Sequence, residues 1–243
     1  MSYFSLANRI PEVSALEPKA VAWLYELTSR IPLVRTTYRR FVAAVLGMGI
    51  KEGYALDLGT GPGSVAIDLA SRNPGLEVIG LDLGAHMIER ARQQGLRNGQ
   101  NGRPPWLQAD GHVLPFADDS FDLVISSFAL HHWQEALDVM NEIARVLRRP
   151  RPDTGQPGGR YYIADVCRET NTFQQIVAYA SIPALSLPFG SYWGYGGYYE
   201  SIRAGYTLDE AQNLLDRSAL PPGRVALDST WFVPALTITS VGI

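Results

Sequence analysis

Short apolar runs alternate with longer amphipathic segments along residues 54–166. An apolar run of about four to eight residues bounded by glycine, proline or polar residues is typical of a buried strand. Apolar positions that recur every three or four residues are typical of a helix packed on one side. These patterns predict strands at residues 54–58, 76–81, 106–108, 121–127 and 161–165, and helices at residues 64–71, 86–97 and 135–147.

The pattern continues less regularly after residue 168. Thr207 is followed three residues later by Glu210, which is the spacing of a capping box, so we expect a further helix to begin there. Two closing strands are predicted at residues 225–230 and 235–241. In the earlier helix at residues 86–97, the expected apolar face includes Leu96.

Strands that alternate with helices form right-handed crossovers, which produce a parallel sheet with helices on both faces. We therefore expect an α/β fold, namely a Rossmann-like, seven-stranded and mostly parallel sheet. Ligands of such sheets bind beyond the carboxyl ends of the strands. The chain is predicted to be a single domain with an N-terminal helical cover (1–50), a core (51–168), a lid inserted between strands 5 and 6 (169–206), and a closing helix with two strands (207–243).

Composition and charge narrow the class of protein. Hydrophobic residues make up 46% of the chain and charged residues 19%, a balance that argues against wholesale disorder. The net charge of −3 creates no strong field for nucleic acid, and the single cysteine, Cys167, fits a reducing compartment. Because no signal sequence or membrane-spanning run is visible, we expect a cytoplasmic protein with no nucleic-acid partner and no stable membrane anchoring. Whether the chain forms a homo-oligomer stays open.

The sharpest motif is Leu-Asp-Leu-Gly-Thr-Gly-Pro-Gly at residues 56–63. Its three glycines follow a predicted strand and precede a predicted helix, where the lack of side chains lets the backbone turn tightly and touch a ligand. A nicotinamide-binding G-x-G-x-x-G motif would need its third glycine at Ser64. Asp57 would also repel a pyrophosphate, whereas its carboxylate suits an amine-bearing ligand.

Several segments in the same order resemble the class I S-adenosylmethionine-dependent methyltransferases, in particular the methyltransferase domain 11/25 group. The matching segments are residues 55–63, 78–83 with Met87, 109–116, 119–124, 128–133 and 145–148. The resemblance implies an enzyme of the EC 2.1.1 class that uses S-adenosyl-L-methionine and releases S-adenosyl-L-homocysteine. The methyl group would move by in-line displacement to a small or medium-sized molecule. Whether the acceptor atom is O, N or C stays open.

The same resemblance implies roles for residues at the strand ends. Asp57 and the glycine turn would hold the methionine part of the cofactor, and Asp82 would accept hydrogen bonds from both ribose hydroxyls. Asp110 would accept from the adenine amino group, although an isolated aspartate at such a position more often caps a turn. The residues expected to bind the cofactor are Asp57, Gly59, Thr60, Gly61, Gly63, Asp82, Leu83, Met87, Ala109, Asp110, Gly111, Phe128 and Ala129.

Methyl transfer from a sulfonium needs alignment of the acceptor, exclusion of water and sometimes removal of a proton. His131 and His132 follow the fourth predicted strand, and either could act as a general base or serve packing. Asp165 ends the fifth predicted strand and could touch the substrate or cap a turn. The four histidines and one cysteine show no zinc-ligand spacing, so no metal site is expected.

Aromatic residues are interleaved with glycines at residues 189–199, between the fifth and sixth predicted strands. Related enzymes insert substrate-covering elements there, so we expect a lid whose aromatic side chains contact the acceptor. The residues expected to bind substrate are Tyr192, Trp193, Tyr195, Tyr198 and Tyr199. The alternative is a surface loop packed on the N-terminal helices, or a patch for self-association.

Two other functions remain open from the sequence alone. An NAD-dependent oxidoreductase is the first, because Asp82 lies about 20 residues beyond the glycine turn, as that fingerprint requires. The second is a non-catalytic sensor or assembly protein that binds S-adenosylmethionine, since such relatives keep the cofactor motif. The Pro/Gly-rich loop at residues 148–159 also departs from the family pattern.

Overall fold

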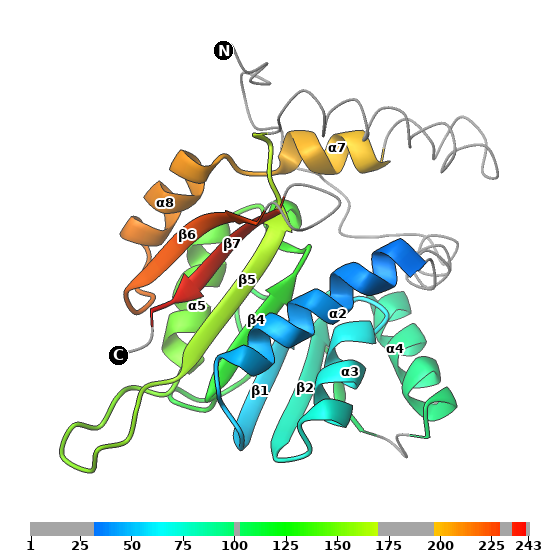
Figure 1. Cartoon of the computed structure of the whole chain (residues 1–243), viewed down its shortest axis with the longest axis horizontal. Helices are drawn as coiled ribbons and strands as arrows, with labels where there is room; N and C mark the ends of the chain where they lie inside the picture. The colour runs from blue at the N-terminus through cyan, green and yellow to red at the C-terminus, as the bar shows by residue number, and fades with distance from the viewer. Residues whose placement is uncertain (1–31, 100–102, 170–196, 229–234, 242–243) are drawn as a thin grey trace.

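The sheet determines where the other elements lie. In the part of the chain that the computed structural model describes (residues 32–99, 103–169, 197–228 and 235–241), seven strands form one sheet in the order β3-β2-β1-β4-β5-β7-β6 (Figure 1). The strands are β1 (Gly53–Leu58), β2 (Leu76–Asp82), β3 (Trp106–Gln108), β4 (Leu123–Ser127), β5 (Arg160–Val166), β6 (Gly223–Asp228) and β7 (Ala235–Ser240). All seven predicted strands are confirmed, with ends that differ by a few residues.

The first five strands pair in parallel, and β7 is antiparallel to both β5 and β6. The chain builds outward from β1 to β3 and then returns to β4 on the other side of β1, so the strand order reverses between β1 and β4. A reversal of this kind leaves a crevice at the carboxyl ends of the strands. The expected Rossmann-like, mostly parallel sheet is therefore confirmed.

Helices cover both faces of this sheet. The described helices are α2 (Pro32–Gly47), α3 (Ser64–Arg72), α4 (Ala85–Arg97), α5 (Ala136–Val146), α7 (Gly197–Ala204) and α8 (Leu208–Arg217), with a short 3-10 helix η1 (Leu130–His132). Figure 1 shows α2 and α3 in front of the sheet, while α5 lies behind it. The helices that connect β1 to β2 and β4 to β5 thus lie on opposite faces, as right-handed crossovers require.

Each face of the sheet has its own hydrophobic core. On the α2 and α3 side, Phe41 is fully buried and meets Tyr162 of β5 edge to face, with ring centroids 5.1 Å apart. On the α5 and α8 side, Met140 and Ile143 of α5 are fully buried against β4, β5 and β7. Because both faces are covered, the central strands are apolar almost throughout, which explains their continuous hydrophobic runs.

Two local expectations have clear outcomes. The capping box is confirmed, because the Thr207 hydroxyl accepts from the Glu210 N–H and the Glu210 carboxylate accepts from the Thr207 N–H. The inward position of Leu96 is wrong: this side chain is 65% exposed. Gly95, one residue earlier in α4, is the buried residue at that turn. The helix therefore turns Leu96 to its outer side.

The expected lid falls mainly outside the described residues. Tyr192, Trp193 and Tyr195 lie there, as does most of the proposed cover at residues 1–50. Tyr198 and Tyr199 lie in α7, a regular helix rather than a glycine-rich loop. The end of the expected lid is therefore helical.

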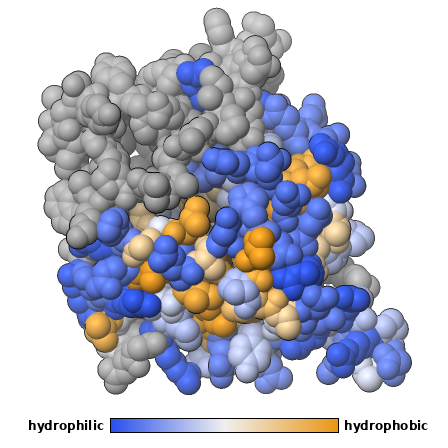
Figure 2. Space-filling model, turned by 180° about the vertical axis from the view of Figure 1, so that it is seen from behind, coloured by the Kyte–Doolittle hydropathy of each residue, from blue (hydrophilic) through white to orange (hydrophobic). Residues whose placement is uncertain are grey.

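One long surface loop lies between α5 and β5. The Pro/Gly-rich segment at residues 148–159 is an irregular loop closed by a single bridge between Arg151 and Gln156. Figure 2 shows one face of the molecule, on which hydrophobic side chains occur in several groups set among hydrophilic ones. Among the described helices, none combines the length and the apolar composition needed to cross a membrane.

Candidate functional site

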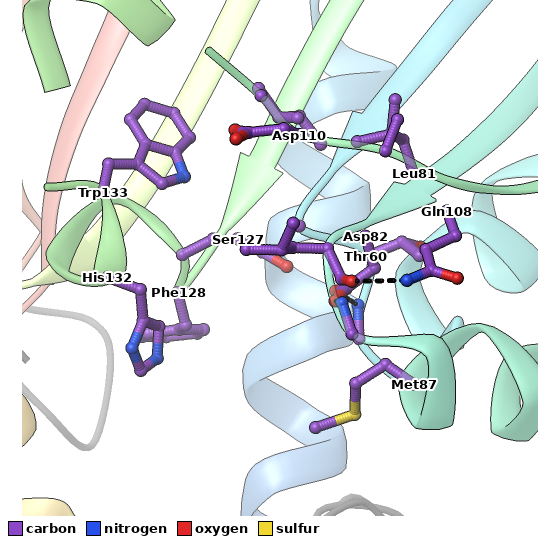
Figure 3. Close-up of a pocket in the computed structure, with 18 of the residues that line it drawn as sticks. Thr60, Leu81, Asp82, Met87, Gln108, Asp110, Ser127, Phe128, His132 and Trp133 are labelled. Carbon is purple, nitrogen blue, oxygen red and sulfur yellow. Dashed lines mark hydrogen bonds between the residues drawn. The ribbon is translucent and has the colours of Figure 1, made fainter. Parts of the chain in front are cut away.

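A cleft of about 690 Å³ opens at the carboxyl ends of β1, β2 and β4. In Figure 3, Asp82, Gln108 and Met87 lie on one side of it, and Phe128, His132 and Trp133 lie on the other. The expected residues that line this cleft are Gly59, Thr60, Gly61, Asp82, Leu83, Met87, Ala109, Asp110, Gly111, Phe128, Ala129 and His132. The structure thus brings most of the sequence-predicted site together.

The glycine turn forms the floor of the cleft. The N–H groups of Gly59 and Thr60 both donate to the Leu81 carbonyl, at 2.8 and 2.9 Å, which fastens the turn to β2. Gly59 has a φ of +72°, and a Cβ at this position would lie 2.4 Å from the Ala129 Cβ. Gly61 has a φ of +53° with open space where its Cβ would be. The turn therefore needs glycine for its backbone conformation at both positions, and at Gly59 also for space.

Asp82 joins the turn that follows β1 to the turn that follows β2. One carboxylate oxygen accepts from the Gly61 N–H and the other from the Gly84 N–H, each at 2.8 Å. Burial raises the pKa of Asp82, and the two N–H donors partly offset that rise. An ionised carboxylate has about four acceptor positions, so each Asp82 oxygen keeps one for a ligand hydroxyl.

Asp57 lies behind the cleft rather than on its wall. Its side chain is fully buried, and one oxygen accepts from the Thr60 hydroxyl at 2.6 Å. The other oxygen has no partner at normal hydrogen-bond distance, although the Ala66 N–H at the start of α3 slightly lowers its pKa. Burial dominates and raises the pKa of Asp57 to about 7. In the described structure Asp57 therefore supports the turn through Thr60.

Gly63 also lies away from the lining of the cleft. A Cβ on Gly63 would come within 2.5 Å of the Trp106 ring, and one on Gly80 would come equally close to the same ring. Trp106 of β3 thus packs where α3, β2 and α4 meet, and both glycines make room for it. The third glycine of the motif serves packing between elements, as in other strand–turn–helix motifs.

Asp110 also lines the cleft, two residues after the end of β3. Its carboxylate accepts from the main-chain N–H of His112 at 2.9 Å and lies 2.6 Å from His112 Nδ1. These hydrogen bonds lower the pKa of Asp110, whose side chain is 54% exposed. Because both contacts use the same carboxylate oxygen, the other oxygen of Asp110 offers an acceptor at the mouth of the cleft.

Phe128 follows β4 in a strained backbone conformation. Its φ is +55°, which is unusual for a bulky residue, and its N–H donates to the Ala164 carbonyl of β5 at 2.8 Å. Such strain persists where the surroundings enforce it, and it is frequent at binding sites. The Phe128 ring meets Tyr38 of α2 edge to face, at a centroid distance of 6.3 Å. Burial raises the pKa of Tyr38 to about 12, so its hydroxyl keeps its proton at neutral pH.

His131, His132 and Asp165 form a cluster under the end of β4. Asp165 is fully buried and accepts from the main-chain N–H of His131 at 2.5 Å, while His131 Nδ1 lies 2.7 Å from its other oxygen. His131 does not line the cleft, whereas His132 does, and their rings lie 4.0 Å apart. No group of three or more His, Cys, Asp or Glu side chains is arranged for a metal ion in the described ranges.

Sequence reasoning missed several side chains that line the cleft. Tyr38, Gln108, Ser127 and Trp133 are examples of these. Gln108 and Ser127 end strands, so the strand-end rule could have found them. No sequence signal points to Tyr38, because its place on the cleft depends on how α2 lies across the sheet.

Comparison with known proteins agrees with this geometry. A family model described as a methyltransferase domain matches residues 56–150, which include the glycine turn, Asp82 and η1. The ubiquinone/menaquinone biosynthesis C-methyltransferase UbiE of Desulfotalea psychrophila is 32% identical over 148 residues, or 60% of this chain and 55% of that protein. The chain spans about half the length of the curated relatives it matches.

Solved structures share the fold over more of the chain. A Methanococcus maripaludis protein assigned to the S-adenosyl-L-methionine-dependent methyltransferases superposes with a TM-score of 0.67 at 20% identity, covering 98% of this chain and 99% of that one. Phosphoethanolamine N-methyltransferase 2 of Haemonchus contortus, solved with S-adenosyl-L-methionine, gives a TM-score of 0.62 at 21% identity, over 88% of this chain and 44% of that one.

The matching family model assigns a methyltransferase domain to residues 56–150. The chain is similar to S-adenosylmethionine-dependent methyltransferases in its fold and to curated methyltransferases in its sequence. The cofactor of such methyltransferases is S-adenosyl-L-methionine.

Proposed function

We propose that this chain transfers the methyl group of S-adenosyl-L-methionine to a small molecule bound in the cleft. The observation that carries the proposal is the pair of hydrogen bonds by which Asp82 joins Gly61 to Gly84 at the cleft wall. This arrangement places two free acceptor positions of one carboxylate beside a side-chain-free turn. A ribose with two neighbouring hydroxyls is a matching ligand.

The residues present fit the cofactor along the whole wall. Asp82 would hold the ribose, Gly59, Thr60 and Gly61 would lie against the methionine part, and Asp110 would accept from the adenine amino group. Apolar contacts to the adenine or the sulfonium end would come from Leu83, Met87, Ala109, Gly111, Phe128 and Ala129. Asp57 and Gly63 would act indirectly, through Thr60 and through Trp106. The bound cofactor would supply an electrophilic methyl group.

We infer that the acceptor lies on the Phe128 side of the cleft. His132 is the member of the histidine–aspartate cluster that faces this space, so we assign any proton transfer to the cluster of His131, His132 and Asp165. Substrate contacts by Tyr192, Trp193, Tyr195, Tyr198 and Tyr199 remain a proposal that rests on their place in the sequence.

We also propose a role for each part of the chain. Residues 51–168 would bind the cofactor, residues 169–206 would cover the substrate, and residues 1–50 and 207–243 would complete one domain. The net charge of −3 and the single cysteine support a cytoplasmic enzyme that acts on small molecules rather than on nucleic acid. The relatives described above support neither an oxidoreductase nor a sensor.

Calorimetry with the purified full chain tests this function. We expect S-adenosyl-L-homocysteine to bind with a single site and NADH not to bind. Transfer of a tritiated methyl group to a panel of metabolites then tests catalysis. Binding of NADH without S-adenosyl-L-homocysteine would favour the oxidoreductase, and tight cofactor binding with no transfer to any acceptor would favour the sensor.

A further inference from the structure

A second, smaller pocket lies between α4 and the edge strand β3, and we call it the outer pocket. Its volume is about 280 Å³, and the described residues that line it are Arg92, Gly95, Leu96, Arg103 and Trp106. None of these five residues lines the larger cleft. Figure 1 shows α4 at the end of the sheet that lies away from β6. The outer pocket is therefore separate from the proposed methyl-transfer site.

The fold does not require a glycine at Gly95. This residue lies inside α4 with a helical backbone, where glycine is less favourable than alanine. A Cβ on Gly95 would meet the Arg103 carbonyl oxygen at 3.5 Å and Trp106 Nε1 at 3.7 Å, which are ordinary contact distances. Because both neighbours line the outer pocket, the missing side chain leaves that pocket open in front of Trp106 instead of relieving a clash.

The Trp106 ring is held in place from its other side. A Cβ on Gly63 would lie 2.5 Å from Cη2 of this ring, and one on Gly80 would lie 2.5 Å from Cζ3. The benzene edge of the indole is therefore packed against these two glycines, while the edge with Nε1 lies beside Gly95. In the part of the chain that the structure describes, Trp106 Nε1 has no hydrogen-bond acceptor. This N–H is thus a donor available to a ligand in the outer pocket.

Two arginines give the outer pocket a positive charge. Arg92 of α4 and Arg103, shortly before β3, are both exposed, and neither guanidinium pairs with a carboxylate within the described ranges. The surrounding segment, residues 85–106, contains four arginines and one acidic residue, Glu89, although the whole chain has a net charge of −3. The local charge therefore favours an anionic ligand.

We propose that the outer pocket binds a small organic anion. Its phosphate or carboxylate group would meet Arg92 and Arg103, because a guanidinium pairs with either group through two parallel N–H donors. The apolar body of the ligand would lie against the Trp106 ring and cover Leu96, which is 65% exposed. This site goes beyond methyl transfer, and its occupation does not depend on the proposed function.

Matched small molecules test this recognition on the full chain. Binding is followed in ¹H–¹⁵N NMR spectra through the indole N–H signal of Trp106, which is assigned by its loss in Trp106→Phe. Benzoate should shift this signal and bind about 10-fold more tightly than benzamide, which has the same shape without the charge. Phenyl phosphate should bind about 10-fold more tightly than inorganic phosphate, which lacks the ring. The tighter of the two organic anions shows whether the group recognised is a carboxylate or a phosphate.

Variants of the lining residues locate the bound anion. Arg92→Ala and Arg103→Ala should each weaken binding of the tighter anion about 10-fold without unfolding the chain, since both side chains are exposed. Arg224→Ala is the matched control, because it removes an exposed arginine from β6 at the opposite edge of the sheet. Its affinity should equal that of the wild type.

Gly95→Ala separates a role in binding from a role in folding. The free energy of unfolding in urea should stay the same or rise, because alanine favours the helix, while the affinity falls at least about 3-fold as the Cβ enters the outer pocket. The proposal is overturned if neither organic anion shifts the Trp106 signal, if benzamide binds as tightly as benzoate, or if inorganic phosphate binds as tightly as phenyl phosphate. Wild-type affinity in both Arg92→Ala and Arg103→Ala would overturn it as well, as would a Gly95→Ala variant that loses stability and keeps its affinity.

Discussion

Gly59 lies against Ala129 with no room for a side chain, since a Cβ on Gly59 would come within 2.4 Å of the Ala129 Cβ. The first residue belongs to the turn after β1 and the second to the segment after β4. This contact therefore joins the cofactor side of the cleft to the wall that carries Phe128 and His132. We therefore expect both the affinity for the cofactor and the shape of the proposed acceptor space to depend on this contact.

Gly59→Ala should damage both stability and binding. The left-handed backbone at φ +72° costs an alanine about 1–2 kcal/mol, and the clash with Ala129 adds about 1–3 kcal/mol. Urea unfolding should show that the free energy of unfolding falls by the sum of these two costs. Calorimetry should show that the affinity for S-adenosyl-L-homocysteine falls at least about 10-fold. Gly155→Ala is the matched control, because Gly155 has a φ of +68° with open space around its Cβ position. Equal effects at the two sites would contradict the role of Ala129.

Asp82→Ala should weaken cofactor binding strongly. The change removes the acceptor for the Gly61 and Gly84 N–H groups and the proposed acceptor for the ribose, so we expect about 100-fold lower affinity for S-adenosyl-L-homocysteine. The control is Asp118→Ala, which removes a half-exposed carboxylate that pairs with Arg145 on the surface. Unchanged affinity in Asp82→Ala would mean that the ribose lies elsewhere.

Asp57 should make stability depend on pH. Its pKa is raised from 3.8 to about 7 in the folded chain, so the folded state binds more protons than the unfolded state between these values. Stability from this group is fully present below pH 4 and is lost as pH rises towards 7. The difference between the two pKa values corresponds to at most about 4 kcal/mol.

Asp57→Asn isolates this contribution. Asparagine stays neutral and can still accept from the Thr60 hydroxyl, so the variant should gain stability relative to the wild type as pH rises from 5 to 8. Urea unfolding of both proteins at four pH values gives the difference directly. The comparison between the two proteins is needed because His132, whose pKa is lowered, makes the stability of both rise with pH between pH 3 and 6.5. This contribution cancels in the difference between them. Parallel stability curves over this range would show that folding does not raise the pKa of Asp57.

Gly80 and Trp106 should be coupled energetically. A Cβ on Gly80 would meet the Trp106 ring at 2.5 Å, so Gly80→Ala should cost about 1–3 kcal/mol through overpacking. Trp106→Leu removes the ring, and the double variant should be more stable than the sum of the single changes by about 1 kcal/mol. Thermal or urea unfolding of the wild type, both single variants and the double variant gives the coupling energy. Strict additivity would show that the ring moves aside.

The sequence locates the proposed cofactor side of the cleft better than the proposed acceptor side. Asp82 and Asp110 could be located because the carboxyl ends of parallel strands meet at one edge. The same rule cannot tell whether an acidic side chain at a strand end faces the cleft or the interior, which is why the buried position of Asp57 was not foreseen. Tyr38 was missed because helix placement across a sheet depends on long-range packing rather than on local pattern.

The position of Tyr38 also affects which substitutions can alter the shape of the cleft. The proposed cofactor contacts of the glycine turn and Asp82 lie within the βα core, whereas part of the opposite wall is supplied by α2, which precedes that core in the chain. A substitution in α2 can therefore reshape the proposed acceptor space while the glycine turn and Asp82 are unchanged. In evolutionary terms, one half of the cleft can diversify under relaxed constraint while the other stays fixed.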